Sequence, residues 1–480
     1  MDSNSKSRAA KNIVITGTAQ AWRLITGFLL TVVTTRLLTP SDFGILAMVA
    51  TATAFIALVK DLGISQAIVQ RDTINPGQIN SLFWVSIAAS TVFALLLGAS
   101  APLIARFYAE PKVELVTIAF SALVLISGPQ AVPAAILNRN SQFNKLAIID
   151  IASATTALAV GVIGALLWRS YWALYASALS ATIVGGVGTW LSSRYRPGSP
   201  HFDTNTAQML RFGSHISGFN IVNYLSRNCD NILIGRFQGG DQLGLYDRAY
   251  RLLLFPITQL HGPIGQVLVP LLSRLQADPN KYRSTYTEAV SLIMIAAQPG
   301  ILFAIICAPQ LFELLLGDQW IPAAPIFQWL GVAALHQVMT STTGWLFLSQ
   351  GRGSDLFKLG AYGAVVTVAS FIIGLPWGAA GVAASYAVVN YVVLLPLIWV
   401  STGLRGPISC ENLVRLAIPH AAAIFATAAI LKAVQYNLQS IGPARMAALV
   451  VLAYFIYLCV ILLFGTKREL LARSVHFIKR

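Results

Sequence analysis

The feature that most constrains this chain is a series of apolar runs, each about as long as a membrane is thick. A helix needs roughly 20 mostly apolar residues to cross the hydrocarbon core of a bilayer. Such runs predict about fourteen transmembrane helices, at residues 13–36, 43–68, 80–105, 114–137, 146–168, 171–192, 213–236, 244–272, 287–308, 322–349, 357–376, 378–401, 412–433 and 444–464. We therefore expect an all-α integral membrane protein.

The composition argues against a soluble protein. Of the 480 residues, 56% are hydrophobic and 11% are charged, whereas charged residues make up about a quarter of a typical soluble domain. The net charge of +15 would suggest a nucleic-acid partner in a soluble protein. In a membrane protein, basic residues gather in cytoplasmic loops, so we expect membrane lipids and no nucleic acid as partners.

The positions of Lys and Arg predict the orientation. With the N-terminus in the cytoplasm, 22 of the 33 basic residues fall in cytoplasmic segments, 7 fall outside and four lie within spans. Residues 1–11 are polar and basic and lack the apolar core of a signal peptide. Both termini are therefore predicted to be cytoplasmic, which requires an even number of spans.

A faint internal repeat divides the chain. Residues 36–44 resemble residues 236–244, because in both an Arg ends one span and a Gly opens the next, and residues 138–146 resemble residues 349–359. The chain then parses as an N-lobe at 1–203, a C-lobe at 204–403, and a helix pair with a tail at 404–480. Two six-helix lobes would be related by a pseudo-two-fold axis along the membrane normal, with a substrate site between them. A purely structural duplication is the alternative.

Charged and polar side chains inside the spans are the candidate site. A charge at bilayer depth costs roughly 3 kcal/mol and usually faces a protein interior or a water-filled path. Guanidinium groups suit phosphate because they stay charged and present a planar fork of donors. The candidates for a cationic, substrate-binding cavity are Arg23, Asn223, Tyr224, Arg227, Arg248 and Arg251. The alternative is that Arg227–Asp230 and Asp247–Arg251 pair within their own helices and only stabilise packing.

Two further features of the predicted seventh and eighth spans bear on transport. Asp230 could bind a coupling proton or sodium ion, although a salt bridge to Arg227 is the plainer interpretation. Pro256, Pro263 and Pro270 recur every seven residues, so their kinks fall on nearly the same side of the helix. They predict a bent, mobile helix beside the cavity, with a static curved helix as the alternative.

The motifs of covalent chemistry are missing from the sequence. It contains no phosphate-binding loop of the G-x-x-x-x-G-K-[ST] type, and no H-E-x-x-H or G-x-S-x-G motif. The four cysteines and the scattered histidines His215, His261, His336 and His420 are not at metal-ligand spacing, so we expect packing roles for them. The sequence predicts no enzyme, no metal and no cofactor beyond a coupling ion.

Several motifs resemble a known family. They are LTPSDFG at 38–44, DLGISQAIVQR at 61–71, APLIARFY at 101–108, DNILIGRF at 230–237, LGLYDRAYRL at 243–252, LVPLLSR at 268–274 and LGDQW at 316–320. Together they resemble the Wzx-type polysaccharide flippases of the MOP superfamily, and within them the exopolysaccharide and colanic-acid exporter branch. The resemblance covers roughly residues 15–400.

This resemblance implies a transporter of the bacterial inner membrane. Its substrate would be an oligosaccharide carried on undecaprenyl pyrophosphate, moved to the periplasmic leaflet by ion-coupled alternating access, for exopolysaccharide or lipopolysaccharide biosynthesis. A polysaccharide polymerase and chain-length machinery would be its partners. A multidrug or metabolite exporter of the related MOP branch is the alternative. A membrane polymerase or ligase is a third possibility, but the large periplasmic loop typical of such enzymes is missing.

Overall fold

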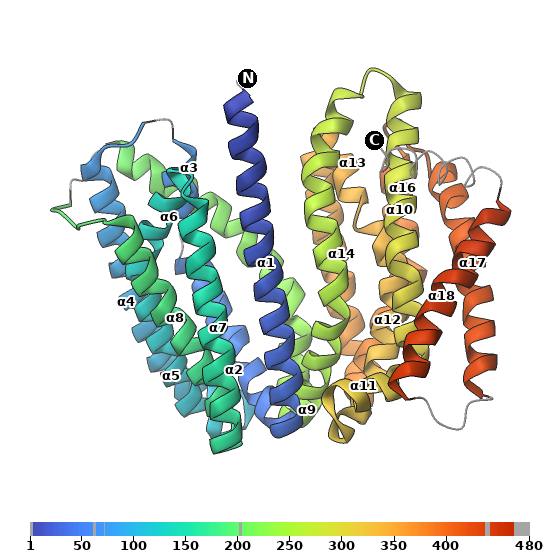
Figure 1. The fold of residues 1–480 in the computed structure, drawn as a ribbon, viewed down its shortest axis with the longest axis horizontal. Helices are drawn as coiled ribbons and strands as arrows, with labels where there is room; N and C mark the ends of the chain where they lie inside the picture. The colour runs from blue at the N-terminus through green and yellow to red at the C-terminus, as the bar shows by residue number, and fades with distance from the viewer. Residues whose placement is uncertain (1–2, 61–63, 72, 201–203, 437–441, 465–480) are drawn as a thin grey trace. The chain divides into compact units, whose positions relative to one another are not determined.

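The computed structural model consists of helices joined by turns and short connections over the residues it describes, which are 3–60, 64–71, 73–200, 204–436 and 442–464. Side chains are not described at 3–13, 59, 66, 70, 204–223, 225–227 and 255–260. No strand occurs in the described ranges. The chain forms two compact units, residues 1–244 and 245–480, and Figure 1 shows their helices.

The first unit consists of eight helices and the beginning of a ninth. They are α1 (Ser3–Leu37), α2 (Pro40–Lys60), α3 (Ile64–Gln70), α4 (Pro76–Tyr108), α5 (Lys112–Ser127), α6 (Ala131–Arg139), α7 (Phe143–Trp168), α8 (Trp172–Ser193) and α9 (Thr204–Arg274), with a 3₁₀ turn η1 (Gly128–Gln130). Helix α4 begins at Pro76, where a missing N–H is harmless. The backbone N–H of Asn75 donates to Gln78 Oε1 at 3.2 Å, which closes that helix end.

The second unit starts within α9 and continues to the C-terminal helices. Its elements are α10 (Pro279–Ile306), α11 (Ala308–Leu316), η2 (Asp318–Ala323), α12 (Ala324–Thr340), α13 (Thr343–Ser349), α14 (Gly353–Gly374), η3 (Leu375–Trp377), α15 (Gly378–Val389), the π-helical turn η4 (Asn390–Leu394), α16 (Leu395–Gly403), α17 (Cys410–Tyr436) and α18 (Pro443–Leu463). Helix α10 begins like α4, with Pro279 in its first turn and Asp278 Oδ1 accepting from Lys281 N at 3.1 Å.

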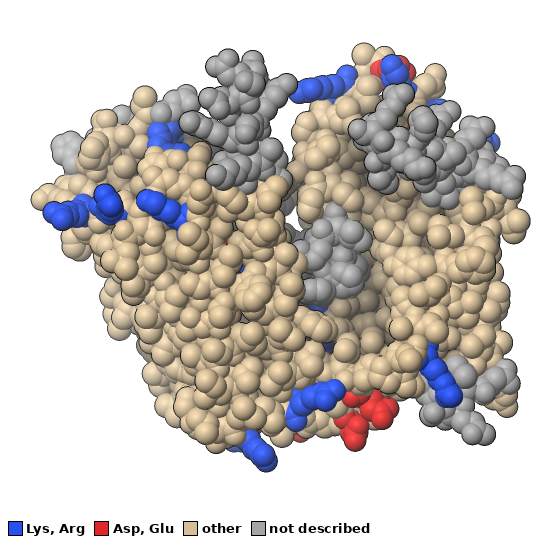
Figure 2. Space-filling view, viewed as in Figure 1, with Lys and Arg blue, Asp and Glu red and all other residues tan. Residues whose placement is uncertain are grey.

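The helices have the length and surface of membrane spans. Within the described ranges, nine helical segments are long and apolar enough to cross a membrane, and the described residues of the predicted spans lie mostly in helices. Large apolar side chains such as Leu95 and Leu103 are 68% and 65% exposed, as expected where lipid replaces water. In Figure 2 most of the described surface is uncharged, and Lys, Arg, Asp and Glu atoms are few. The protein is an all-α, multi-pass membrane protein, and the number fourteen stays a prediction.

The shortest predicted connections are genuine turns. Arg169 ends α7 in the left-handed region with φ of 45°, and Gly378 begins α15 with φ of 73°. A left-handed residue ends a helix because the next N–H can no longer continue the ladder. The chain therefore breaks where the sequence predicted, at residues 169–170 and after Trp377.

The two halves of the predicted repeat meet each other within the first unit. A Cβ atom on Gly44 would lie 1.8 Å from the carbonyl oxygen of Gly240, and one on Gly244 would lie 1.9 Å from that of Pro40. The contact is reciprocal, because position 40 corresponds to 240 and 44 to 244 in the repeat. Small residues permit such close approach of membrane helices. The repeated glycines thus hold α2 against α9 in backbone contact.

The boundary between the compact units lies within α9, after Gly244. The first part of α9 belongs with the N-terminal helices because it packs on α2 through these glycines and on α4 through Gly235, where a Cβ would lie 2.8 Å from the Tyr108 ring. The predicted lobes at 1–203 and 204–403, and the predicted pair at 404–480, remain predictions.

Candidate functional site

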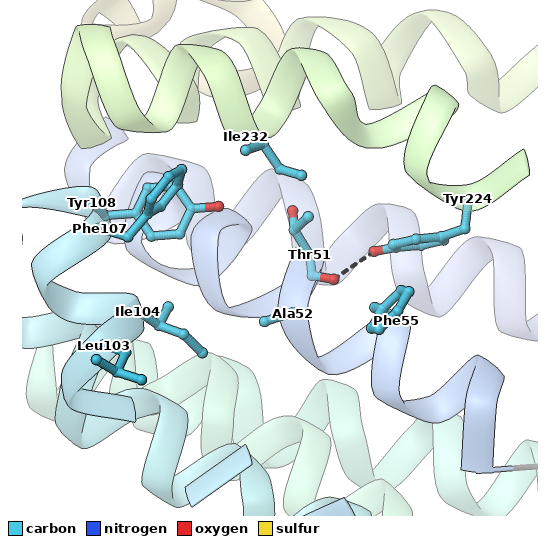
Figure 3. Close-up of a pocket in the computed structure, with 9 residues that line it drawn as sticks. All are labelled: Thr51, Ala52, Phe55, Leu103, Ile104, Phe107, Tyr108, Tyr224 and Ile232. Carbon is cyan, nitrogen blue, oxygen red and sulfur yellow. Dashed lines mark hydrogen bonds between the residues drawn. The ribbon is translucent and has the colours of Figure 1, made fainter. Parts of the chain in front are cut away.

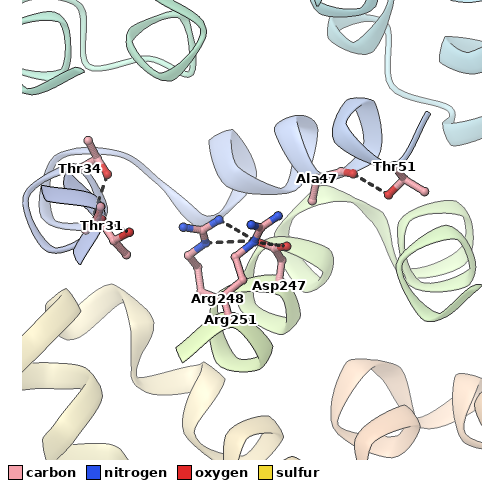
Figure 4. Close-up of polar contacts among 8 residues, drawn as sticks. Thr31, Thr34, Ala47, Thr51, Asp247, Arg248 and Arg251 are labelled. Carbon is pink, nitrogen blue, oxygen red and sulfur yellow. Dashed lines mark hydrogen bonds and ion pairs between the residues drawn. The ribbon is translucent and has the colours of Figure 1, made fainter. Parts of the chain in front are cut away.

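Two of the predicted arginines share one carboxylate in the second unit (Figure 4). Arg248 donates to Asp247 Oδ2 through Nη2 at 2.6 Å and through Nε at 3.1 Å. Arg251, one turn along α9, donates through Nε to both Asp247 oxygens at 2.8 and 2.9 Å. We name these three residues the Asp247 cluster. The predicted pairing within one helix is therefore present here.

The members of the Asp247 cluster differ in their exposure. The side chains of Asp247 and Arg248 are 6% and 14% exposed, whereas that of Arg251 is 59% exposed. The buried carboxylate neutralises part of the charge that α9 carries and fixes how the guanidinium groups lie. The cluster can therefore present a positioned guanidinium to an anion, which a salt bridge closed on all sides could not do.

Arg23 has a neighbouring carboxylate that lies outside its own helix. Arg23 is exposed on α1. The carboxylate of Asp150 on α7 is close enough to interact electrostatically with its guanidinium. The next residue, Trp22, donates from Nε1 to Thr155 Oγ1 on α7 at 2.9 Å. Sequence reasoning missed Asp150, although an acidic residue inside the predicted span 146–168 was a visible signal.

Tyr224 binds the backbone of α2. Its hydroxyl donates to the carbonyl oxygen of Thr51 at 2.8 Å, and its ring packs on Phe55 at 6.3 Å between centroids. Figure 3 shows this hydrogen bond at one end of a pocket in the first unit. The hydrogen bond from the Tyr224 hydroxyl therefore positions α9 on α2. A role of Tyr224 in binding sugar stays a prediction.

The remaining predicted site residues lie on α9. Asp230 is buried, 4% exposed, and its Oδ1 accepts from the backbone N–H of Asn231 at 2.8 Å. Asn223 and Arg227 fall on positions whose side chains lie outside the described part of the chain, so the predicted Arg227–Asp230 pair is untested. In the part that the structure describes, no group of three or more His, Cys, Asp or Glu residues could hold a metal ion.

The helix α9 loses helical backbone at Gly239, whose φ and ψ are 81° and −178°. This position lies inside the polar turn that separates the predicted seventh and eighth spans. Of the three predicted hinge prolines, Pro263 and Pro270 are exposed on α9, and the side chain of Pro256 lies outside the described residues. Their role in motion stays a prediction.

A second buried polar group joins four helices of the second unit. His420 Nε2 lies 2.9 Å from Ser291 Oγ, and His420 Nδ1 lies 2.7 Å from the Tyr457 hydroxyl. Tyr457 donates to Gln298 Oε1, and Gln298 Nε2 donates to the carbonyl oxygen of Leu335 at 2.8 Å. We name this the His420 chain. It confirms that His420 is a hydrogen-bonded packing histidine.

The proton positions along the His420 chain follow from its chemistry. Gln298 uses its amide N–H on Leu335, so its Oε1 must accept the single hydroxyl proton of Tyr457. His420 Nδ1 must then donate to the Tyr457 oxygen, and its Nε2 forms the bond with Ser291 Oγ. The four side chains of the chain are at most 1% exposed. It ties α17 and α18 to α10 and α12.

Comparison with known proteins agrees with this architecture. Residues 33–325 match the family model described as "Polysaccharide biosynthesis protein", which is more than half of the chain. The lipopolysaccharide biosynthesis protein WzxC of Escherichia coli (strain K12) is 24% identical over 74% of this chain and 73% of its own length. The succinoglycan biosynthesis transport protein ExoT of Rhizobium meliloti (strain 1021) is 24% identical over 76% of this chain and 74% of its own.

Solved structures share the fold at low sequence identity. The lipid II flippase MurJ, in an inward closed conformation, aligns with a TM-score of 0.73 at 13% identity, covering 95% of this chain and 100% of that chain. A multidrug resistance MATE family transporter of the MOP superfamily, in an inward-facing conformation, aligns with a TM-score of 0.61 at 14% identity, covering 82% and 95%. The chain therefore belongs to the polysaccharide biosynthesis protein family, in agreement with the Wzx-type resemblance of its motifs.

Proposed function

We propose that this protein is a flippase for lipid-linked oligosaccharides. It moves repeat units carried on undecaprenyl pyrophosphate from the cytoplasmic to the periplasmic leaflet of the bacterial inner membrane, by alternating access, with both of its termini in the cytoplasm. The family, the named relatives in lipopolysaccharide and succinoglycan biosynthesis, and the fold shared with a lipid II flippase support this proposal. The product serves exopolysaccharide or lipopolysaccharide synthesis, beside a polymerase and chain-length machinery.

The observation that carries the proposal is the Asp247 cluster. One buried carboxylate holds two guanidinium groups on a membrane helix, and one of them is 59% exposed. A pyrophosphate offers several acceptor oxygens to such a planar donor group, and charge-assisted hydrogen bonds are about twice as strong as neutral ones. We assign pyrophosphate binding to Arg248 and Arg251, with Arg23 and Arg227 as further cavity arginines and Asn223 and Tyr224 beside the sugars.

The movement itself needs a driving force and a mobile element. We assign coupling to H⁺ or Na⁺, with the buried carboxylate of Asp230 as the candidate ion site. Pro256, Pro263 and Pro270 on α9 are the candidate hinges, since each proline removes a backbone hydrogen bond from its helix. These assignments refine the mechanism and can fail while the substrate assignment holds.

Export of small drugs or metabolites is the competing function, and the fold shared with a MATE transporter favours it. A cationic drug would be repelled by the exposed guanidinium of Arg251. Efflux of a cationic dye by vesicles containing this protein, with no transport of lipid-linked glycan, would establish the competing function instead.

The decisive experiment replaces Arg251 with alanine in cells that depend on this chain for polymer export. Arg251→Ala should abolish export while the amount of protein in the membrane stays normal, because the exposed guanidinium meets the pyrophosphate and the pair it leaves is mostly solvent-screened. Export is measured as polymer outside the cell, and the protein is quantified by immunoblot of the membrane fraction.

The matched control is Arg415→Ala. Arg415 also pairs with a carboxylate one turn away, Glu411, but on α17, and both side chains are well exposed, at 74% and 67%. Its loss should leave export unchanged. Export at the normal level in Arg251→Ala would remove the site assignment. Loss of export in both variants would mean that removing any paired arginine disturbs the protein, and that the loss is not specific to the Asp247 cluster.

A further inference from the structure

The first unit contains a pocket whose chemistry the proposed site does not use. A cavity of about 370 Å³ lies between α2, the end of α4 and the first part of α9, and Figure 3 shows its lining. Its apolar wall consists of Ala52, Phe55, Leu103, Ile104, Phe107 and Ile232. Because Leu103 and Phe107 are also 65% and 46% exposed, the wall is continuous with the lipid-facing surface of α4.

The polar groups around the pocket are mostly engaged elsewhere. Thr51 Oγ1 donates to the carbonyl oxygen of Ala47 at 2.9 Å, and the Tyr224 hydroxyl donates to the carbonyl oxygen of Thr51. The hydroxyl of Tyr108 differs, since it points from the α4 side toward Thr51 in Figure 3. The interior thus offers a ligand mainly hydrocarbon contact, with one phenol to bind an oxygen atom.

A cation stands beside this apolar wall. The guanidinium of Arg236 lies over the ring of Phe107 at 5.9 Å and over the ring of Phe237 at 5.6 Å. Among the described residues, Arg236 takes part in none of the ion pairs formed with Asp or Glu. Arg236 is exposed near the bend of α9 at Gly239. A basic residue at a helix end commonly meets lipid phosphate.

The apolar pocket and the adjacent cation together match an anionic lipid. We propose that the pocket binds a polyisoprenoid phosphate, with the first part of its chain against Phe55 and Ile104 and its phosphate on Arg236. This inference rests on the proposed function, which makes a polyisoprenoid lipid the substrate.

The site has a place in the transport cycle. With the N-terminus in the cytoplasm, the connection between the predicted seventh and eighth spans, 213–236 and 244–272, lies outside, and Arg236 stands at its start. A lipid bound here therefore has its head in the outer leaflet. It is a release-side site, separate from the Asp247 cluster, which meets the pyrophosphate during translocation. A lipid chain held by α2, α4 and α9 keeps the flipped substrate at the protein until its head group has left.

The test measures binding without transport. The protein, purified in nanodiscs, is titrated with undecaprenyl phosphate or with phosphatidylglycerol, and bound lipid is counted by native mass spectrometry. Ala52→Phe fills the cavity and Arg236→Gln removes the charge from an exposed position, where folding is not at risk. Each should weaken undecaprenyl phosphate binding about tenfold, the factor that ~1.4 kcal/mol represents, and change phosphatidylglycerol binding less than about twofold.

Matched controls sharpen the result. Leu95→Phe adds bulk at a 68% exposed position of α4 outside the pocket, and Arg169→Gln removes another exposed arginine at a helix end of the same unit. Both should bind undecaprenyl phosphate normally. Equal loss of both lipids in Arg236→Gln would reveal an ordinary phospholipid site, and unchanged binding in Ala52→Phe and Arg236→Gln would reveal no lipid site; either result overturns the proposal. Efflux of a cationic dye with no transport of lipid-linked glycan, while undecaprenyl phosphate binds as expected, would instead count against the proposed function alone.

Discussion

The Asp247 cluster and the His420 chain are both polar groups buried in membrane helices of the second unit, and they are built differently. In the His420 chain single hydrogen bonds connect the groups in series, from Ser291 to the carbonyl oxygen of Leu335. In the Asp247 cluster two guanidinium groups share one carboxylate. The first is built from Ser, His, Tyr and Gln side chains, and the second from two arginines and an aspartate.

This difference indicates that the His420 chain stabilises the fold, whereas the Asp247 cluster can also bind an anion. The guanidinium of Arg251 is held by Asp247 and is still 59% exposed, so the cluster can meet an additional anion. No side chain in the His420 chain is more than 1% exposed, so that chain presents no surface to a ligand. We therefore expect stability to depend on both groups and transport to depend on the Asp247 cluster alone.

Removing the shared carboxylate should have the largest effect. Asp247→Asn leaves Arg248, whose side chain is 14% exposed, without its anionic partner in a membrane helix. Breaking a buried ion pair on one side costs about 3–5 kcal/mol, so unfolding in detergent should occur at a markedly lower denaturant concentration. The free energy of unfolding is measured by circular dichroism.

Asp247→Glu is the control, since it keeps the charge and should recover most of that stability. If Asp247→Asn unfolds at the same denaturant concentration as the parent protein, the carboxylate does not stabilise the two arginines. The claim that the Asp247 cluster contributes to stability would then be wrong.

Breaking the His420 chain should have a smaller effect, confined to stability. Tyr457→Phe leaves Gln298 Oε1 without its donor and His420 Nδ1 without its acceptor, and an unsatisfied buried polar group costs about 1–3 kcal/mol. The surviving folded protein should transport at the normal rate per molecule. Thermal unfolding of purified protein and export normalised to membrane protein test the two statements.

Phe455→Tyr is a useful control, because it alters a 64% exposed position on the same helix. It should change neither property. A loss of transport in Tyr457→Phe that exceeds its loss of folded protein would give the His420 chain a functional role and remove the contrast with the Asp247 cluster.

Much of this architecture was predictable because membrane helices follow a local rule. Apolar length alone located the helices, and the turns at Arg169 and Gly378 fell where the apolar runs are interrupted. The repeat at 36–44 and 236–244 also proved informative, since its glycines at 44 and 244 meet the opposite copy. A glycine repeated at equivalent positions indicates that two helix backbones approach closely there, and such a repeat can be read from the sequence alone.

The side-chain partners were less predictable, because they depend on which helices pack together. The Asp247–Arg251 pair was visible as a spacing of four within one helix. The neighbourhood of Arg23 and Asp150, and the chain from Ser291 to Tyr457, join residues more than a hundred positions apart. The pocket beside Phe107 was unpredictable for the same reason, since residues of three helices form it.

The substitution with the smallest expected effect on stability, Arg251→Lys, best distinguishes the charge of the side chain from the shape of its guanidinium. Arg251→Lys keeps the positive charge near Asp247 but loses the planar fork of donors. Because Arg251 is 59% exposed, the free energy of unfolding should change by less than ~1 kcal/mol. Loss of one charge-assisted hydrogen bond, worth about 1.5 kcal/mol, should slow transport roughly tenfold. Arg415→Lys, an equivalent change in the exposed pair with Glu411, should slow it not at all. Normal transport by Arg251→Lys, together with its loss in Arg251→Ala, would mean that the site reads charge and not the shape of the guanidinium.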